Sequence, residues 1–307
     1  PVMEGKAILF KKCADIDAID IEVDTKNPDE FIETVARIAP TFGGINLEDI
    51  KAPECFYIEE ELQKRLNIPV FHDDQHGTAI VVTAALINSL EIQQKKIDEV
   101  KIVIIGAGAA AIATSKHLCR MGVDKKQITM IDSKGVIHED RQSLPEHKSE
   151  WAQSGTERTL DDAIAGADVV IGLSGPNLIS ENNIAQMNRN PIIFALSNPT
   201  PEIDPKIVDR VRPDAIIATG RSDYPNQVNN LLCFPYLFRG ALLGGSSKIT
   251  EQMLAAATYA IADLAKQPSD TSDQVSFGPK YIIPKSLDPR LKETVSTAVA
   301  NASKSTS

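Results

Sequence analysis

Residues 104–111 of the chain read Ile-Ile-Gly-Ala-Gly-Ala-Ala-Ala, which matches the pattern G-x-G-x-x-A. In such a turn Gly106 permits a tight bend, Gly108 lets the backbone approach a pyrophosphate, and Ala111 lets a helix pack closely on a strand. An apolar, strand-like run precedes the pattern, and a helix-like run begins at Ala109. Because a dinucleotide-binding turn needs this context, we expect these residues to contact a dinucleotide rather than form a packing turn that binds nothing.

The carboxylate expected to accompany such a turn is Asp132, about 26 residues after Gly106, near the position from which an acidic residue bonds a ribose hydroxyl. This residue favours NAD as the cofactor. Ser133 and Lys134 follow it directly and could accommodate the 2′-phosphate of NADP. The sequence therefore leaves the choice between NAD and NADP open.

Two pairs of neighbouring carboxylates form a second group, Glu48-Asp49 and Asp73-Asp74. Adjacent residues cannot share one face of a continuing strand or helix, so both pairs are useful only where an element ends and side chains converge. Gathered carboxylates raise one another's pKa unless a cation neutralises them. Ligation by oxygen alone suits Mg²⁺ or Mn²⁺ rather than Zn²⁺. Taken by themselves, these residues are more typical of helix N-caps at solvated turns than of a metal site.

Three further groups of residues could bind a ligand or take part in catalysis, but each also has a purely structural interpretation. His72 and His76 lack a third nitrogen or sulfur ligand, so we expect packing or surface histidines. Lys6 is expected at the mouth of a strand, where it acts as a general base only if a nearby cation and partial burial lower its pKa. The amides of Asn198, Asn229 and Asn230 could hold a carboxylate or a carboxamide, and turn or N-cap chemistry is the alternative.

The apolar pattern predicts the elements that position these side chains. Before the charged connector at residues 93–99 we expect two strands within 7–23, helices over 27–38, after Pro53 and over 77–90, and a short apolar segment at 43–47. After it, strands alternate with helices, which indicates a parallel sheet covered on both faces. The expected strands are 101–105, 128–131, 168–173, 191–196 and 215–218, and the expected helices are 109–121, 160–164, 248–264 and 289–303.

This pattern predicts an α/β protein with three parts. Residues 1–92 form a smaller, truncated α/β domain for substrate and metal, residues 93–285 a Rossmann-like, parallel-sheet dinucleotide-binding domain, and residues 286–307 a C-terminal helical tail. A length of 307 residues suits two hydrophobic cores.

Composition narrows the function classes. The chain has 32 basic and 42 acidic residues and a net charge of −10, which gives no electrostatic support to a nucleic-acid or membrane surface. Its four scattered cysteines fit a reducing compartment without disulfides, so we expect a cytoplasmic protein. Its most apolar run is shorter than the roughly 20 residues that cross a bilayer, and we see no secretory signal.

Several motifs in order resemble the malic enzyme family, in its small-subunit prokaryotic type. They are PVMEGKA, FGGINLEDI, FHDDQHGTA, IIGAGAAA, FALSNPTPEI, ATGRSDYPNQVNN and YIIPKSLDPR. The resemblance implies oxidative decarboxylation of L-malate to pyruvate and CO₂, with NAD or NADP, a divalent metal, Mg²⁺ or Mn²⁺, and a homodimer. Position by position it implies that the metal ligands are Glu48, Asp49 and Asp74, that Lys6 is the general base with Asp73 beside it, and that Asn198, Asn229 and Asn230 contact substrate, with Asn198 also near the cofactor.

One part of the family's pattern has no counterpart here. Members carry an upstream Tyr-Thr-Pro motif whose tyrosine resembles the acid that protonates C3, and this chain begins at Pro1 without an initiator methionine. We therefore expect a truncated or proteolysed chain, or a partner that supplies the missing part. None of the tyrosines has the motif's context, so we assign none to that role: Tyr57, Tyr224, Tyr236, Tyr259 and Tyr281.

Three alternatives stay open at this point. One is a nicotinamide dehydrogenase of the amino-acid dehydrogenase type, which needs no carboxylate-bound metal. Another is a module that binds dinucleotide and metal without turnover. A malolactic reaction, which retains the cofactor and releases lactate, is a third possibility within the resembled family.

Overall fold

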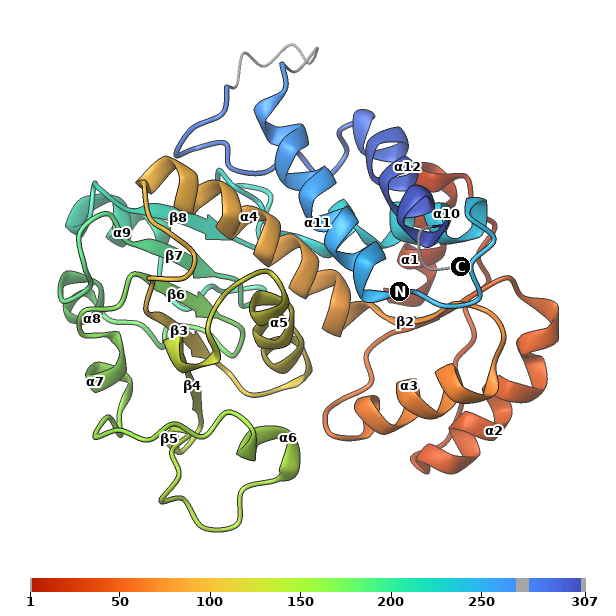
Figure 1. Cartoon of the computed structure of the whole chain (residues 1–307), viewed down its shortest axis with the longest axis horizontal. Coiled ribbons are helices and arrows are strands. Elements are labelled where there is room, and N and C mark those ends of the chain that lie inside the picture. Colours follow the sequence, from red (N-terminus) through yellow and green to blue (C-terminus); the bar gives the residue numbers. More distant parts are fainter. Residues whose placement is uncertain (1, 269–275, 305–307) are drawn as a thin grey trace.

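The structure is a computed structural model that describes residues 2–268 and 276–304 (Figure 1). Pro1 of the first motif and residues 305–307 of the predicted tail lie outside the described residues. Within these ranges no helix is long and apolar enough to cross a membrane. All four cysteines are free thiols, as the sequence predicts.

The larger sheet is mainly parallel, with the strand order β5-β4-β3-β6-β7-β8 in the described residues. The five strands expected from apolar runs are confirmed, and each is almost fully buried because both faces of the sheet are covered. A short antiparallel edge strand, β5, was not expected. The bounds are β3 (Ile102–Ile105), β4 (Ile128–Asp132), β5 (Gly135–Val136), β6 (Val169–Gly172), β7 (Ile192–Ala195) and β8 (Ile216–Thr219).

Helices cover both faces of this sheet, as predicted. On one face Ile102 and Ile104 share a core with α4 (Thr78–Gln93), α5 (Ala109–Arg120) and α11 (Glu251–Lys266), and on the other Val103 and Ile105 share a core with short helices. This alternation follows from the period of two along a strand. The short helices are α7 (Leu160–Ile164), α8 (Glu181–Ala185) and α9 (Pro205–Val211), and α6 (Glu146–Ser149) lies in the long loop after β5 (Figure 1).

A second, two-stranded parallel sheet pairs β1 (Ile45–Leu47) with β2 (Val70–His72). It packs with α2 (Pro28–Ile38) and α3 (Glu54–Arg65) around a small core that includes Ile32, Leu47 and Leu62. The expected helices at these positions are confirmed. Because Leu47 pairs with His72, the residues that follow the two strands emerge side by side.

The prediction of two strands within residues 7–23 is wrong. The chain forms α1 (Val2–Ala14), and residues 15–23 have no regular secondary structure. The repeat that decides this is helical, because Lys6, Phe10 and Ala14 are four residues apart and share one face. Phe10 packs edge-on against Phe234, with ring centroids 5.0 Å apart. Lys6 therefore lies on a buried helix face, not at the mouth of a strand.

The C-terminal helices pack together beside α1. Helix α10 (Phe234–Leu243) lies against α12 (Arg290–Lys304), and α12 also packs on α11, so the two ends of the chain come near each other (Figure 1). A Cβ on Gly240 would meet Val299 Cβ at 2.6 Å, so only glycine permits this approach of α10 to α12. Single turns complete the described elements: η1 (Ala39–Thr41), η2 (Asp73–Gly77), η3 (Lys125–Gln127) and η4 (Asn230–Leu232).

The predicted domain boundary at residues 93–99 stays a prediction. Helix α4 precedes it, yet α4 packs on α5 and α11 and its Ile80 and Leu86 share a core with Ile102 of the larger sheet. The N-terminal part of the chain is thus joined to that sheet through a continuous hydrophobic core.

Candidate active site

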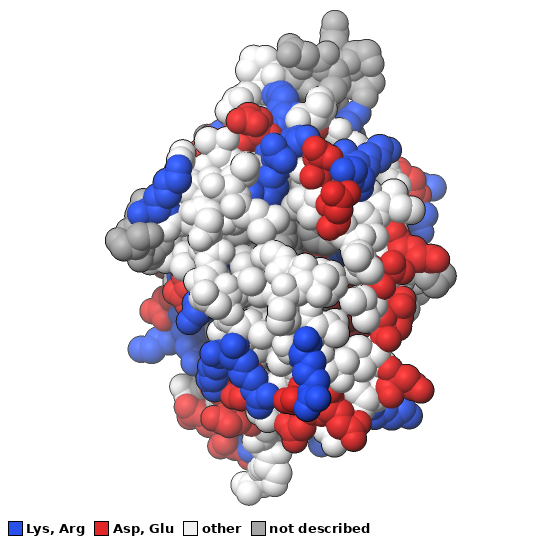
Figure 2. Space-filling view, turned by 90° about the vertical axis from the view of Figure 1, so that its right-hand side faces the viewer, with Lys and Arg blue, Asp and Glu red and all other residues white. Residues whose placement is uncertain are grey.

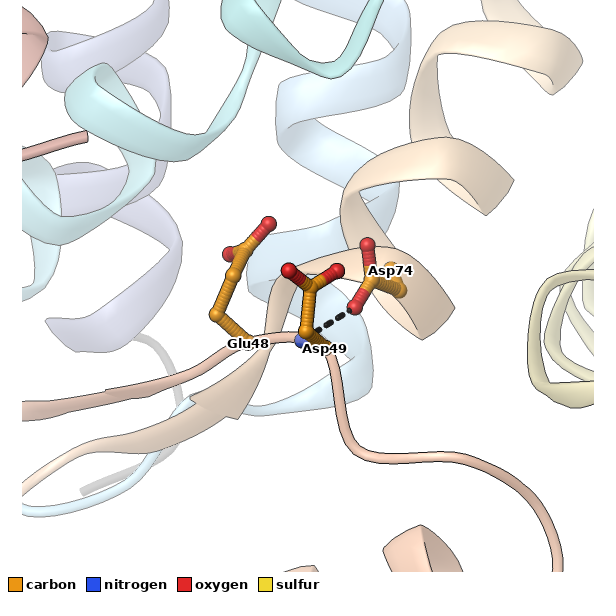
Figure 3. A group of neighbouring side chains, drawn as sticks. All are labelled: Glu48, Asp49 and Asp74. Atoms are coloured by element: carbon orange, nitrogen blue, oxygen red, sulfur yellow. Dashed lines mark hydrogen bonds between the residues drawn. The ribbon is translucent and has the colours of Figure 1, made fainter. Parts of the chain in front are cut away.

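Three carboxylates converge at the carboxyl end of the smaller sheet (Figure 3). Glu48 and Asp49 follow β1 and Asp74 follows β2, so the parallel register of the strands brings them together. One oxygen from each lies within 4.8 Å of the others. The backbone N–H of Asp49 also donates to Asp74 Oδ2 at 2.8 Å. The arrangement that the sequence predicts for this trio is therefore present.

The chemistry of this trio fits a divalent cation. All its donors are carboxylate oxygens, which suit Mg²⁺ or Mn²⁺. Burial raises the pKa of Glu48, the charge of Asp74 adds to that effect, and Lys6 opposes it. Like charges held this closely repel one another unless a cation compensates them. Neither His72 nor His76 belongs to the group: His72 is buried with Nε2 3.2 Å from the Ile50 carbonyl oxygen.

Lys6 reaches the trio from α1 and is held by two carboxylates. Its Nζ lies 3.0 Å from Glu48 Oε1 and contacts Asp73 Oδ2, and it also lies over the Phe234 ring, 4.1 Å from the centroid. Asn230 Nδ2 donates to the same oxygen of Asp73 at 2.6 Å. The structure thus brings Lys6, Glu48, Asp73 and Asn230 into one connected group.

The charges of this group raise the Lys6 pKa, whereas a general base would need it lowered. Burial by itself lowers the pKa of Lys6, but the carboxylates of Asp73 and Glu48 outweigh burial and raise it. Burial also raises the pKa of Asp73 to about 7, with Lys6 acting in the opposite direction. A cation on Glu48 would compensate one of the two negative charges that act on Lys6.

Asp73 lies in a tight cradle made by the turn that follows β2. Its side chain is fully buried, and Oδ1 has no hydrogen-bond partner. A Cβ on Gly77 would come 2.0 Å from that oxygen. The single π-helical turn η2 therefore requires glycine at position 77, because any side chain there would displace Asp73.

Lys6, Glu48 and Asp49 also line a groove between α1, α2 and the segment 16–23. Most other lining side chains are apolar, among them Phe10, Ile19 and Leu242. Figure 2 shows the face of the molecule at the right of Figure 1, where mostly uncharged surface surrounds a hollow. The charged group is therefore open to small molecules on one side and packed against hydrophobic side chains on the other.

The expected dinucleotide turn joins β3 to α5. Gly106 has φ of +123°, and a Cβ there would meet the Leu173 carbonyl oxygen at 2.6 Å, so the bend requires glycine. A Cβ on Gly108 would have no atom within 4 Å, which leaves open space where a pyrophosphate would approach the backbone. Helix α5 begins at Ala109 without a side-chain cap, and Ala111 is buried against the sheet. These features fit a dinucleotide.

Asp132 ends β4, next to this turn, and its oxygens already have donors. Arg141 binds both oxygens at 2.9 and 3.0 Å, Lys148 Nζ lies 3.0 Å from Oδ2, and the Lys134 backbone N–H donates to Oδ1 at 2.9 Å. Burial would raise the pKa of Asp132, but these donors hold it well below its usual range. The carboxylate therefore anchors two cationic side chains beside Ser133 and Lys134, which are both exposed.

The three asparagines have different surroundings. Asn198 follows β7 and lies against Gly220, where a Cβ would come 2.7 Å from its Nδ2. Asn229 accepts from the Leu231 backbone N–H at 2.9 Å and so caps η4, the alternative that the sequence left open. Among the described residues, Asn230 alone of the three hydrogen-bonds to the group around Lys6.

Sequence reasoning missed two buried glutamates near these sites. Glu202 accepts from the backbone N–H groups of Ser174 and Ser197, at 3.1 and 3.0 Å, and so joins the loops after β6 and β7. Glu59 bonds three residues of the segment that carries Asp73 and Asp74. Helical spacing could have identified Glu59, since it falls on the same face as the apolar residues of α3.

No pattern in the sequence could have identified Arg141 and Lys148, the two cationic side chains that bind Asp132. Arg141 lies in the loop after β5 and Lys148 in the short helix α6, and no periodicity relates either of them to Asp132. Their convergence on that carboxylate comes from the tertiary structure alone.

A glycine-rich turn at the carboxyl edge of a parallel sheet is typical of proteins with a Rossmann-like dinucleotide-binding fold. The family model "Malic enzyme, N-terminal domain" matches residues 1–63, and "Malic enzyme, NAD binding domain" matches residues 75–280. The chain belongs to the malic enzyme family. These matches do not favour an enzyme of the amino-acid dehydrogenase type.

Individual relatives agree with this assignment. The chain is 57% identical to the NADP-dependent malic enzyme of Escherichia coli (strain K12) over 98% of its own length, and 54% identical to that of Halomonas elongata, also over 98%. It spans only 41% of the length of the first relative and 73% of the second. The crystal structure of the NAD-dependent malic enzyme from Thermotoga maritima has a TM-score of 0.89 and 45% identity, covering 98% of this chain and 78% of that one.

Proposed function

We propose that this chain carries the metal, substrate and dinucleotide sites of an enzyme that converts L-malate to pyruvate and CO₂ while it reduces NAD(P). The observation that carries the proposal is the convergence of Glu48, Asp49 and Asp74 beside the Lys6–Asp73 pair. Family membership and the named relatives support the reaction. The two alternatives from the sequence that remain are a non-catalytic binding module and a malolactic outcome.

Each residue has a defined task in this proposal. Glu48, Asp49 and Asp74 hold Mg²⁺ or Mn²⁺, which when bound polarises the C2 oxygen of malate and stabilises the negative charge that develops as CO₂ leaves. Lys6 Nζ would accept the proton of the C2 hydroxyl, and a bound dinucleotide would supply the acceptor for the C2 hydride. Asp73 keeps Lys6 at the trio, and Asn230 fixes Asp73.

Fewer residues of this chain are assigned to the later steps, which are the loss of CO₂ and the protonation of C3. The C3–C4 bond breaks, its electron pair moves to C3, and a proton must then reach C3. Tyr57 donates to Asp29 on the surface, and Tyr236 is buried within α10, so neither is assigned as the acid. Asn198, at the carboxyl end of β7, is proposed to contact substrate and nicotinamide from the larger sheet, and Asn229 stays a weaker candidate because it caps η4.

The surroundings of Asp132 favour NADP over NAD. Four donors use both oxygens of this carboxylate, so a ribose 2′-hydroxyl would have to displace one of them. Arg141 and Lys148 bring two positive charges to a single negative one, and this excess suits a 2′-phosphate. Gly106, Gly108, Ala109 and Ala111 are proposed to hold the pyrophosphate.

We also propose a cytoplasmic homodimer, on the resemblance to small-subunit prokaryotic malic enzymes and on the four free cysteines, which fit a reducing compartment. No nucleic-acid or membrane partner is proposed, because the net charge of −10 gives no support to either. Sedimentation at several protein concentrations tests the dimer: a species of twice the chain mass supports it, and a concentration-independent monomer contradicts it.

The function is tested by following reduced dinucleotide after mixing the protein with L-malate, NADP and Mn²⁺. We expect turnover that stops on chelation with EDTA and produces equal amounts of pyruvate and NADPH. Lactate without net NADPH would instead support the malolactic reaction. If the encoding gene extends beyond this chain, the longer protein is assayed beside the 307-residue chain. Binding without turnover in the shorter protein alone identifies the chain as a binding module.

A further inference from the structure

Glu59 is a buried carboxylate that the reaction does not use directly. It lies on α3 with only 6% of its surface exposed, on the helix face that it shares with Cys55, Ile58 and Leu62. Within the described ranges no lysine or arginine forms an ion pair with it. A buried, ionised carboxylate is costly unless hydrogen bonds compensate its lost hydration. The burial of Glu59 therefore depends on the hydrogen bonds that it accepts.

All the hydrogen bonds of Glu59 go to one short segment. Its Oε1 accepts from the His72 backbone N–H at 3.0 Å. Its Oε2 accepts from Gln75 Nε2 at 3.1 Å and lies 2.9 Å from His76 Nε2. The three contacts span residues 72–76, from the end of β2 through most of the π-helical turn η2. A single side chain thus fixes this segment at three points.

That segment carries Asp73 and Asp74 between the contact points. His72 precedes them and Gln75 follows them, so the direction in which both carboxylates leave the backbone depends on the path that Glu59 imposes. The His72 ring also lies 3.2 Å from the Ile50 carbonyl oxygen, next to Asp49. The contacts of Glu59 therefore extend to the loop that supplies the other two members of the trio.

We propose that Glu59 is a positioning residue for the metal site: it holds the turn after β2 so that Asp74 meets Glu48 and Asp49, and Asp73 meets Lys6. This inference rests on the proposed function, because it assumes that the trio binds a cation. Glu59 does not touch the trio, and it acts through the backbone at His72 and through the side chains of Gln75 and His76. Residues that orient metal ligands in this way typically change affinity about 10- to 100-fold when they are replaced.

The need for a carboxylate at this position follows from the donors around it. A glutamine whose NH₂ group faces Gln75 and His76 finds an acceptor there only if the Gln75 amide turns over and His76 Nε2 loses its proton. In the opposite orientation its NH₂ group faces the His72 backbone N–H, which can only donate. Two donors that face each other leave a buried polar group unsatisfied. Alanine would remove all three bonds and leave the turn without its support.

The test compares Glu59→Gln and Glu59→Ala with Glu60→Gln in the same protein. Glu60 is the next residue of α3, is exposed and pairs with Lys64 at 2.7 Å, so its replacement is a matched control for charge and helix. Free Mn²⁺ is measured by electron paramagnetic resonance in titrations without substrate. Binding of adenosine 2′,5′-bisphosphate, measured by calorimetry, reports on the distant dinucleotide turn, and a thermal melt reports on stability.

We expect the dissociation constant for Mn²⁺ to rise about 10- to 100-fold in Glu59→Ala, and by a smaller factor in Glu59→Gln. Glu60→Gln should bind Mn²⁺ like the unaltered protein, and all three variants should keep its nucleotide affinity. Unchanged Mn²⁺ affinity in Glu59→Gln and Glu59→Ala would overturn the inference, as would a parallel loss of nucleotide binding in both. Failure of the unaltered protein to bind Mn²⁺ is a separate result that overturns the proposed function itself.

Discussion

The two proposed ligand sites, the turn after β3 and the ends of β1 and β2, are built in different ways. The turn after β3 offers backbone N–H groups and open space at Gly108, so its chemistry depends on the absence of side chains. The ends of β1 and β2 offer the side chains of Glu48, Asp49 and Asp74, which need support from Lys6 and Glu59. A site made by the backbone is encoded locally, whereas a site made by charged side chains depends on distant residues.

Because the two proposed sites depend on different residues, we expect a substitution to weaken binding at one site without weakening it at the other. Replacement of Asp74 by asparagine should have the largest effect, because it removes the negative charge of a proposed ligand and leaves a single amide oxygen to serve either the cation or the Asp49 N–H. We expect Mn²⁺ affinity to fall more than about 100-fold, beyond the range for residues that only orient ligands, and malate turnover to fall with it. Paramagnetic resonance titration measures the first effect, and NADPH formation measures the second.

The control for that variant is its nucleotide affinity, which should not change. If Asp74→Asn lost affinity for adenosine 2′,5′-bisphosphate by as large a factor as it lost affinity for Mn²⁺, the two sites would not be independent.

Replacement of Gly106 by alanine should affect the dinucleotide turn alone. The new Cβ would meet the Leu173 carbonyl oxygen at 2.6 Å, and φ of +123° is unfavourable for alanine. We expect the free energy of unfolding to fall by about 1–3 kcal/mol and nucleotide affinity to fall clearly, with Mn²⁺ affinity retained. Chemical denaturation and calorimetry measure these effects.

The matched control is Gly108→Ala, where a Cβ has open space. It should keep stability while it weakens nucleotide binding, because the methyl group occupies the room that a pyrophosphate needs. Equal stability loss in the two variants would contradict the assignment of different tasks to the two glycines.

Arg141 and Lys148 are charged side chains that lie beside the backbone site after β3 and are expected to change its preference between nucleotides. In Lys148→Ala we expect affinity for adenosine 2′,5′-bisphosphate to fall about 10-fold relative to adenosine 5′-phosphate, the loss of one charge-assisted hydrogen bond. Arg141→Ala should act in the same direction. The ratio of the two affinities, measured by calorimetry, is the deciding quantity, and an unchanged ratio would mean that Asp132 and its cations do not select the 2′-phosphate.

The smallest effect is expected at Glu202. Glutamine would leave one of the two N–H donors, from Ser174 or Ser197, facing an NH₂ group. We expect a loss of about 1 kcal/mol in the free energy of unfolding, or roughly 2–4 °C in the melting temperature. A stabilised variant would show instead that the burial that raises the pKa of Glu202 costs more than its two hydrogen bonds contribute.

A region could be predicted from the sequence where neighbouring residues determine its structure, and could not where distant residues do. The strands around Gly106 were predictable because fully buried strands read as apolar runs and the glycine pattern depends on local geometry. The segment 7–23 was not, since an apolar run flanked by charges fits a strand as well as the helix that buries Phe10. The convergence of Glu48, Asp49 and Asp74 could be predicted. The contacts of Lys6 could not, because they depend on helix α1, and we predicted strands in that part of the chain.

The central claim is that Glu48, Asp49 and Asp74 hold one divalent cation. Anomalous diffraction from crystals of the protein grown with Mn²⁺ tests it most directly. We expect a single strong anomalous peak between these three carboxylates, at coordination distance from an oxygen of each. A peak elsewhere, or none at this position when the crystals contain bound Mn²⁺, would contradict it.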